Sequence, residues 1–218
     1  MHDVIIILQP EMVSHGHIFL LSPAKAGGPR YSMLVREAAD FELARRLRHG
    51  AATIGEIYSF ISGLYFRGKM AYSEAFRAAP PGLPASVVMV PGAGLVPPET
   101  PVNIEQLRAI SEIPVDEANP VFRDPLKEAA TLLDRHAEGA CSYVLLGSVA
   151  SVKYTAPLLE VFGERLLFPI DFAGRGDMSR GGLMLRRARE GVELPYVPVR
   201  GAPVHGARPP RLERWRKQ

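Results

Sequence analysis

The chain has little of what disulfide-stapled, exported or membrane-inserted proteins contain. Cys141 is its one cysteine among 218 residues, so an internal disulfide framework is excluded. No apolar run approaches the roughly 20 residues of a membrane-spanning helix. The start, MHDVIIILQPEM, has an acid and no Lys or Arg before its apolar run, unlike a secretory signal. We therefore expect a cytoplasmic protein with no membrane partner.

Several common catalytic signatures are also missing. The Gly-x-Ser-x-Gly elbow of serine hydrolases is absent, and the glycine-bearing loop at residues 22–32 lacks the GxxxxGK[ST] motif of a P-loop. A zinc site is not expected in a chain with a single cysteine. We predict neither a metal nor a cofactor.

Positive charge is concentrated at the C-terminus. Residues 200–218 contain six Lys or Arg and one acid, a net charge of +5, whereas the other 199 residues carry 20 basic and 22 acidic side chains. Such a tail suits contact with a polyanion, because each neutralised phosphate releases counterions. The alternative is a solvated terminus with no partner. We divide the chain into a domain of residues 1–199 and a basic Pro/Arg-rich tail of residues 200–218.

Short apolar runs alternate with helical patterns along the chain. Alternation of this kind predicts an α/β fold, with a mostly parallel or mixed central sheet flanked by helices. The predicted strands are 4–8, 18–21, 86–90, 142–146 and 166–170, with an edge strand at 193–199. The predicted helices include 37–48, two within 53–76, 103–110, one starting with Asp124 as cap and Pro125, and 150–162.

Four of the predicted strands end in loops that contain Gly or Ser, after residues 21, 90, 146 and 170. In a mostly parallel sheet these ends lie along one edge, where α/β proteins bind ligands. We therefore predict one composite site. Its candidate ligand-binding residues are Lys25, Arg30, Ser148, Lys153, Arg175, Asp177, Ser179 and Arg180, and its candidate acid/base groups are Glu99 and Asp171.

The stretch from Phe168 to Glu190 carries the strongest signal. A strand is followed by four glycines interleaved with Arg175 and Arg180, and then by a helical pattern. Backbone N–H groups at a helix start and guanidinium groups both bind anions, so we interpret this stretch as a phosphate site. The alternative is a structural turn in which Asp177 or Ser179 only caps the helix.

Glu99 and Asp171 are the carboxylates of the predicted site. Glu99 follows two prolines, which restrict its backbone, so its carboxylate could bind a base edge or sugar hydroxyl or act as general acid/base. Its carboxylate could equally hold a neighbouring turn in place through hydrogen bonds.

The order of several short motifs resembles the peroxide-stress YaaA-like family. The motifs are Leu21–Lys25 (LSPAK), Phe60–Tyr65, the loop Gly94–Pro98, Ser151–Tyr154 and Arg180–Met184 (RGGLM). The loop Gly94–Glu99 is also similar to one in archaeosine tRNA-modification proteins. Gly182, inserted before Leu183, departs from the family pattern. The resemblance implies nucleic-acid binding, with DNA or a nucleobase-related ligand as partner, and leaves catalysis open.

Three functions remain as hypotheses. The first is a nucleic-acid-binding or nucleobase/nucleotide-related protein. The second is a small-molecule enzyme, a hydrolase or a glycosyl/phosphoryl-transfer enzyme, that acts on a phosphorylated substrate. The third is a binding protein without catalysis, in which the loops are structural. The sequence does not indicate which oligomeric state the protein adopts.

Overall fold

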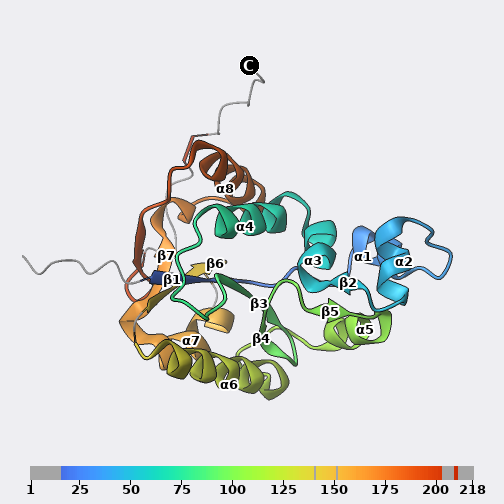
Figure 1. Ribbon diagram of the computed structural model, residues 1–218, viewed down its shortest axis with the longest axis horizontal. Coiled ribbons are helices and arrows are strands. Elements are labelled where there is room, and N and C mark those ends of the chain that lie inside the picture. Colours follow the sequence, from blue (N-terminus) through green and yellow to red (C-terminus); the bar gives the residue numbers. More distant parts are fainter. Residues whose placement is uncertain (1–15, 140, 151, 203–208, 211–218) are drawn as a thin grey trace, which may run out of the picture.

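A six-stranded mixed sheet forms the centre of a single α/β domain (Figure 1). The computed structural model describes residues 16–139, 141–150, 152–202 and 209–210. The strand order is β4-β3-β1-β6-β7-β8; β3, β1, β6 and β7 are parallel, and β4 and β8 run antiparallel at the two edges. The predicted fold class is confirmed.

The strands are β1 (Gly16–Leu21), β3 (Ser86–Val90), β4 (Gly94–Val96), β6 (Cys141–Leu146), β7 (Leu166–Pro169) and β8 (Tyr196–Pro198). Helices cover both faces of β1, and its last four residues, Ile18 to Leu21, are fully buried. This explains the continuous apolar run, since a parallel strand buried on both faces does not alternate.

Helices lie in two layers around this sheet (Figure 1). On one face lie α4 (Leu64–Ala75) and α8 (Asp177–Glu190); on the other lie α6 (Pro120–Ala137) and α7 (Val152–Phe162). Beyond one end of the sheet are α1 (Pro29–Val35), α2 (Glu42–Arg48), α3 (Ile54–Ser62) and α5 (Ile104–Glu112). Two short strands, β2 (Ala52–Thr53) and β5 (Pro101–Val102), pair there as a separate ribbon. Two 3-10 turns, η1 (Gly163–Arg165) and η2 (Ile170–Phe172), flank β7.

The crossing of α4 and α8 depends on two glycines. A Cβ on Gly68 would lie 2.7 Å from the carbonyl oxygen of Gly181, and one on Gly181 would lie 2.7 Å from that of Leu64. The missing side chains let the two backbones touch. Gly181 was predicted to belong to an anion-binding loop, but it lies inside α8 and serves helix packing.

The loop after β3 is a similar correction. Residues 91–93 form a tight turn into β4, and a Cβ on Gly94 would lie 2.4 Å from the carbonyl oxygen of Pro125. Gly94 has a φ of 78°. This glycine is therefore needed for the close approach of β4 to α6, and its predicted place in a ligand loop is wrong.

Two helix predictions and one loop prediction also differ from the structure. Helix α6 starts at Pro120, because the Asn119 side chain accepts a hydrogen bond from the Val121 N–H and Pro120 occupies the first turn. Pro125 consequently lies inside the helix. The helix predicted over 37–48 begins only at Glu42, and α1 replaces part of the loop that was expected to present Arg30.

Two predictions fall on residues that the structure does not describe. The strand predicted at 4–8 lies outside the described residues, as do 203–208 and 211–218 of the basic tail. Within the described part of the chain, no helix is long and apolar enough to cross a membrane.

Candidate ligand pocket at the carboxyl edge of the sheet

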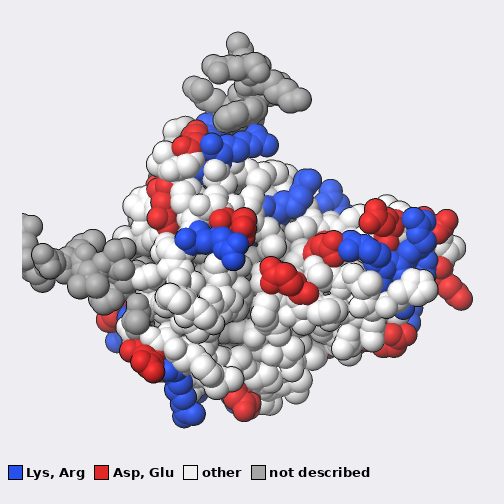
Figure 2. Space-filling view, in the orientation of Figure 1, with Lys and Arg blue, Asp and Glu red and all other residues white. Residues whose placement is uncertain are grey.

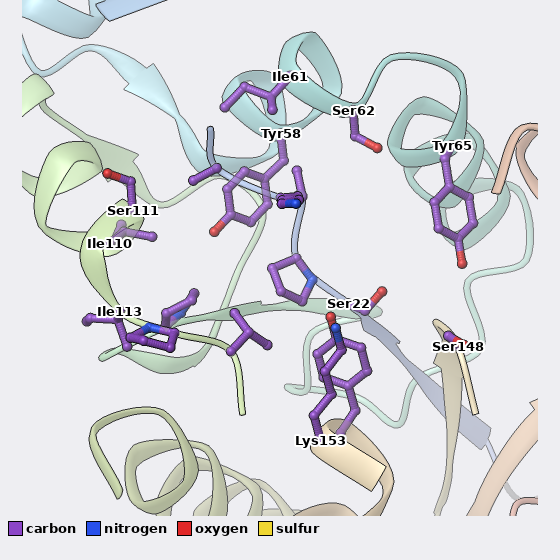
Figure 3. A pocket seen from close by; sticks show the side chains of 18 of the residues that line it. Ser22, Tyr58, Ile61, Ser62, Tyr65, Ile110, Ser111, Ile113, Ser148 and Lys153 are labelled. Carbon is purple, nitrogen blue, oxygen red and sulfur yellow. The ribbon is translucent and has the colours of Figure 1, made fainter. Parts of the chain in front are cut away.

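A cavity of about 690 Å³ opens at the carboxyl ends of β1, β3 and β6 (Figure 3). Because these strands are parallel, the loops that follow them meet at this edge. The walls are completed by α3, the start of α4, the end of α5, and the starts of α7 and α8. The residues that line it are Ser22, Pro23, Ala24, Lys25, Ala26, Tyr58, Ile61, Ser62, Tyr65, Pro91, Ile110, Ser111, Ile113, Pro114, Val115, Ser148, Lys153, Tyr154 and Asp177.

The cavity lies where the strand order reverses. Along the chain the parallel strands run β1, β3, β6, β7, but in space β3 and β6 flank β1 on opposite sides. The loops after β1 and β6 therefore leave toward opposite faces, a place where open α/β sheets bind ligands. They touch beneath the cavity: the Ser22 N–H donates to the Leu146 carbonyl at 3.4 Å, and a Cβ on Gly147 would lie 3.0 Å from the Ser22 Cβ.

Three tyrosines contribute much of the wall. Tyr58, Tyr65 and Tyr154 come from α3, α4 and α7, and each is more than nine-tenths buried. Burial raises the pKa of all three phenols, that of Tyr65 to about 12, so they are neutral near pH 7. The Tyr65 hydroxyl is buried, and no group in the described part of the chain meets it at full hydrogen-bond geometry. The Arg180 guanidinium beside it opposes the rise in its pKa through its charge and a hydrogen bond. A polar ligand could complete the hydrogen bonding of this hydroxyl.

Two lysines and one acid provide charge at the cavity. Lys25 follows β1, and Lys153 lies in the first turn of α7 with its Nζ 4.9 Å from the centre of the Tyr154 ring. Figure 3 shows the Lys153 side chain rising from α7 into the cavity. Asp177 enters from the start of α8 and forms a 3.8 Å ion pair with Arg180. Two lysines against one aspartate favour an anionic ligand.

A fully buried lysine lies directly behind this wall. Lys69, on α4, is 1% exposed, and its Nζ lies 2.7 Å from the Ser22 Oγ and 2.8 Å from the Ser22 carbonyl oxygen. Its Nζ also lies 4.2 Å from the centre of the Tyr65 ring. Burial lowers the pKa of Lys69 to about 7; Asp177 raises it and Arg180 lowers it further, both by smaller amounts.

Four of the predicted site residues are brought together by the fold. Lys25, Ser148, Lys153 and Asp177 all line the cavity, although they come from three separate loops and helix starts. The expectation that distant loops converge at one edge is correct for these four.

Glu99 does not join them. It is exposed and borders a separate, shallow depression of about 450 Å³ beside Arg46 and Glu56. The hairpin β3–β4 carries the chain away from the cavity before residue 99. The prediction that Glu99 meets Lys25 and Arg180 in one site is therefore wrong.

Arg30 also has a different place. Its Nη1 donates to the Phe60 carbonyl at 3.2 Å, near the end of α3, and a Cβ on Gly63 would lie 2.2 Å from that same nitrogen. Arg30 therefore caps a helix end and does not line the cavity.

The loop after β7 is held mainly by contacts within itself. The Arg175 Nε donates to the Asp171 carbonyl at 2.9 Å, and its Nη1 donates to the Ser179 Oγ at 3.2 Å. Arg180 is buried, and its Nε donates to the Phe172 carbonyl at 3.2 Å. None of these four side chains lines the cavity. For Asp171, Arg175 and Ser179, this geometry favours the structural turn over the anion site.

Lys69 and Ser22 are the residues that the sequence analysis missed as a pair. The signal was available: Lys69 follows Tyr65 by four residues and precedes Tyr72 by three, so it lies on the buried face of an aromatic helix. A lysine on such a face requires a partner. Its partner, Ser22, is 47 residues away in the sequence.

Figure 2 shows basic and acidic side chains interleaved over α2 and α8, with uncharged surface between them. No group of three or more His, Cys, Asp or Glu within the described ranges could hold a metal ion.

Comparison with protein-family models, with curated proteins and with solved structures finds no match for this chain.

Proposed function

We propose that this protein binds a nucleotide-like ligand, an aromatic ring joined to a phosphate group, in the cavity at the carboxyl edge of the sheet. The observation that carries the proposal is that three buried tyrosines and two lysines border one cavity. Its volume of about 690 Å³ is within the range of roughly 300–1,000 Å³ that small-molecule sites occupy.

The chemistry of the walls supports such a ligand. Tyrosine rings offer apolar surface to a base, and their hydroxyls, neutral near pH 7, can donate to or accept from its polar edge. Lys25 and Lys153 provide ammonium groups for a phosphate, and Ser22 and Ser148 add hydroxyl groups to the lining. Three of the segments that resemble the YaaA-like family border this cavity: Leu21–Lys25, Phe60–Tyr65 and the one that ends at Tyr154.

Calorimetric titration with nucleoside monophosphates, the corresponding nucleosides and inorganic phosphate tests the proposal. We expect the monophosphates to bind more tightly than either part alone. Lys153→Met should weaken their binding about tenfold or more, because a charge-assisted hydrogen bond contributes about 1.5–3 kcal/mol. Lys127→Met is the matched control, since Lys127 pairs with Glu160 and does not line the cavity.

Equal losses in Lys153→Met and Lys127→Met would contradict the proposed site. So would the absence of any monophosphate binding at millimolar concentration.

A nucleic acid whose terminal or unpaired nucleotide enters the cavity is a second candidate. The observation that favours it is the net charge of +5 in residues 200–218. Mobility-shift assays across a salt series test it, because binding through phosphates weakens steeply with salt. Removal of residues 203–218 should then weaken binding of single strands while leaving mononucleotide binding unchanged.

A further inference from the structure

The pair formed by Ser22 and Lys69 has the arrangement of a nucleophile and its base. Ser22 stands at the end of β1 and lines the cavity, where Figure 3 shows its hydroxyl on the side of Tyr65 and Ser148. Lys69 lies behind it on α4, out of contact with solvent, with its Nζ 2.7 Å from the Ser22 Oγ. A ligand in the cavity therefore meets the hydroxyl first, and only its atoms at the carbon that Oγ attacks come near the amine.

The second contact of Lys69 fixes which way its hydrogens point. The Ser22 carbonyl oxygen, 2.8 Å from Nζ, can only accept a hydrogen bond, so it takes one N–H of the amine. In the neutral amine, the lone pair is then available to the Ser22 hydroxyl proton. The other acceptor near that hydroxyl, the Leu146 carbonyl, lies 3.4 Å away and competes weakly.

The surroundings keep a large share of this amine neutral. Among the residues that the structure describes, no carboxylate forms an ion pair with Lys69; the charged groups that face it are Asp177 and Arg180, both on α8, and these oppose one another. On its own helix it meets the rings of Tyr65 and Phe66. Its pKa of about 7 follows mainly from burial, so near neutral pH the amine is available as a base.

We propose that Ser22 is a catalytic nucleophile and Lys69 its general base, and that together they hydrolyse a carboxylic ester of a phosphate-bearing alcohol. Lys69 accepts the Ser22 hydroxyl proton while Oγ forms a bond to the carbonyl carbon. The ester C–O bond then breaks, and the ammonium of Lys69 returns its proton to the leaving oxygen. Water attacks the acyl-serine in the same way, which releases the carboxylic acid and restores the Ser22 hydroxyl.

This reaction differs from the serine hydrolases whose elbow motif the sequence lacks. Its serine follows the first sheet strand, in the segment Leu21–Lys25, and its base is a lysine in place of histidine. The inference rests on the proposed function for its substrate class, because the phosphate-bearing part of the ester would occupy the cavity beside Lys25 and Lys153.

Two electrophiles that contain no nucleotide test the pair. An alkyl fluorophosphonate loses fluoride when a serine oxygen attacks its phosphorus, and para-nitrophenyl acetate leaves an acetyl-serine and releases nitrophenolate. Mass spectrometry of the full-length protein should place both adducts on Ser22. The labelling rate should rise with pH through about 7 and then level off, as Lys69 loses its proton.

Variants separate catalysis from folding. Ser22→Ala should abolish labelling at this site, and Lys69→Met should slow it about 100-fold and remove the pH dependence. Two controls should label like the wild type. Ser73→Ala removes a different buried serine, which lies on α4 and donates to the Met70 carbonyl, and Lys127→Met removes a surface lysine. Circular dichroism establishes that each variant is folded.

The outcomes distinguish the two proposals. Lys69-dependent labelling of Ser22 supports the pair even if no nucleotide binds, in which case only the proposed function fails. Nucleotide binding without labelling by either probe up to about pH 9 overturns the pair and leaves the proposed function standing. Labelling of another residue, or an unchanged rate in folded Lys69→Met, also overturns it.

Discussion

Replacing Lys69 by Met should change how the stability of the protein depends on pH. Lys69 is fully buried, and burial lowers its pKa from 10.5 to about 7. In the unfolded chain the amine keeps its proton up to about pH 10.5, whereas in the folded chain it loses it near pH 7. Between these values the unfolded state binds more protons, so the free energy of unfolding rises with pH.

The size of the effect follows from the two pKa values. A difference of about 3.5, at roughly 1.4 kcal/mol for each pKa unit, corresponds to about 5 kcal/mol of destabilisation below pH 7. Between about pH 7 and pH 9 the free energy of unfolding should therefore rise by about 2 kcal/mol. This window avoids the buried tyrosines, whose titration begins above it.

Lys69→Met removes the titrating group but keeps most of the side-chain volume. Its cost is two lost hydrogen bonds to Ser22, at roughly 1–3 kcal/mol each. This cost does not depend on the titration of Lys69, so the stability of the variant relative to the wild type should be highest below pH 7 and should fall as the pH rises.

Urea unfolding at about pH 6, 7, 8 and 9 measures this difference. We expect the wild-type and Lys127→Met proteins to share a pH slope that Lys69→Met lacks, with a change of about 2 kcal/mol in the variant's relative stability between pH 7 and 9. If the free energies of unfolding of the wild type and Lys69→Met change in parallel with pH across this range, Lys69 does not titrate near pH 7 and the reasoning fails.

Two further predictions concern packing and an ion pair. Gly181→Ala should destabilise the protein by roughly 1–3 kcal/mol in urea unfolding, because its Cβ would lie 2.7 Å from the Leu64 carbonyl oxygen. Gly176→Ala, whose Cβ would meet nothing within 4 Å, should cost less than about 1 kcal/mol; equal losses would contradict the packing argument. A hydrogen bond from Arg165 lowers the pKa of Asp134, so this pair stabilises the fold above the ordinary carboxyl pKa and is lost as acid is added. Asp134→Asn should reduce the loss of stability between about pH 5 and pH 2 in the same assay, and an unchanged acid profile would refute this.

The central strands and their common edge could be predicted from the sequence. The runs at 18–21, 86–90, 142–146 and 166–170 are short, apolar and rich in β-branched or aromatic residues, a local signal for buried strands. Parallel pairing then places the loops after them together, which is why Lys25, Ser148 and Lys153 were predicted correctly as neighbours.

The glycines misled the prediction because their role depends on distant backbone. Gly94 is required by Pro125 on α6, and Gly181 by Leu64 on α4. Nothing near either glycine in the sequence distinguishes a close helix contact from a ligand-binding turn. Pro125 was misplaced for a related reason. The local pair Asp124-Pro125 predicts a helix start, but the cap at Asn119 starts α6 earlier and leaves Pro125 inside the helix.

The pairing of Lys69 with Ser22 connects stability to the proposed chemistry. A lysine that served structure alone would be stabilised by a buried carboxylate or would extend its amine to water, and Lys69 does neither. An apolar side chain of similar size could fill the same space without the desolvation penalty of about 5 kcal/mol that the pKa of about 7 implies. That penalty falls on an amine that contacts a hydroxyl lining the cavity. Because destabilised groups are concentrated where activity requires them, the cost itself argues that the amine of Lys69 is used.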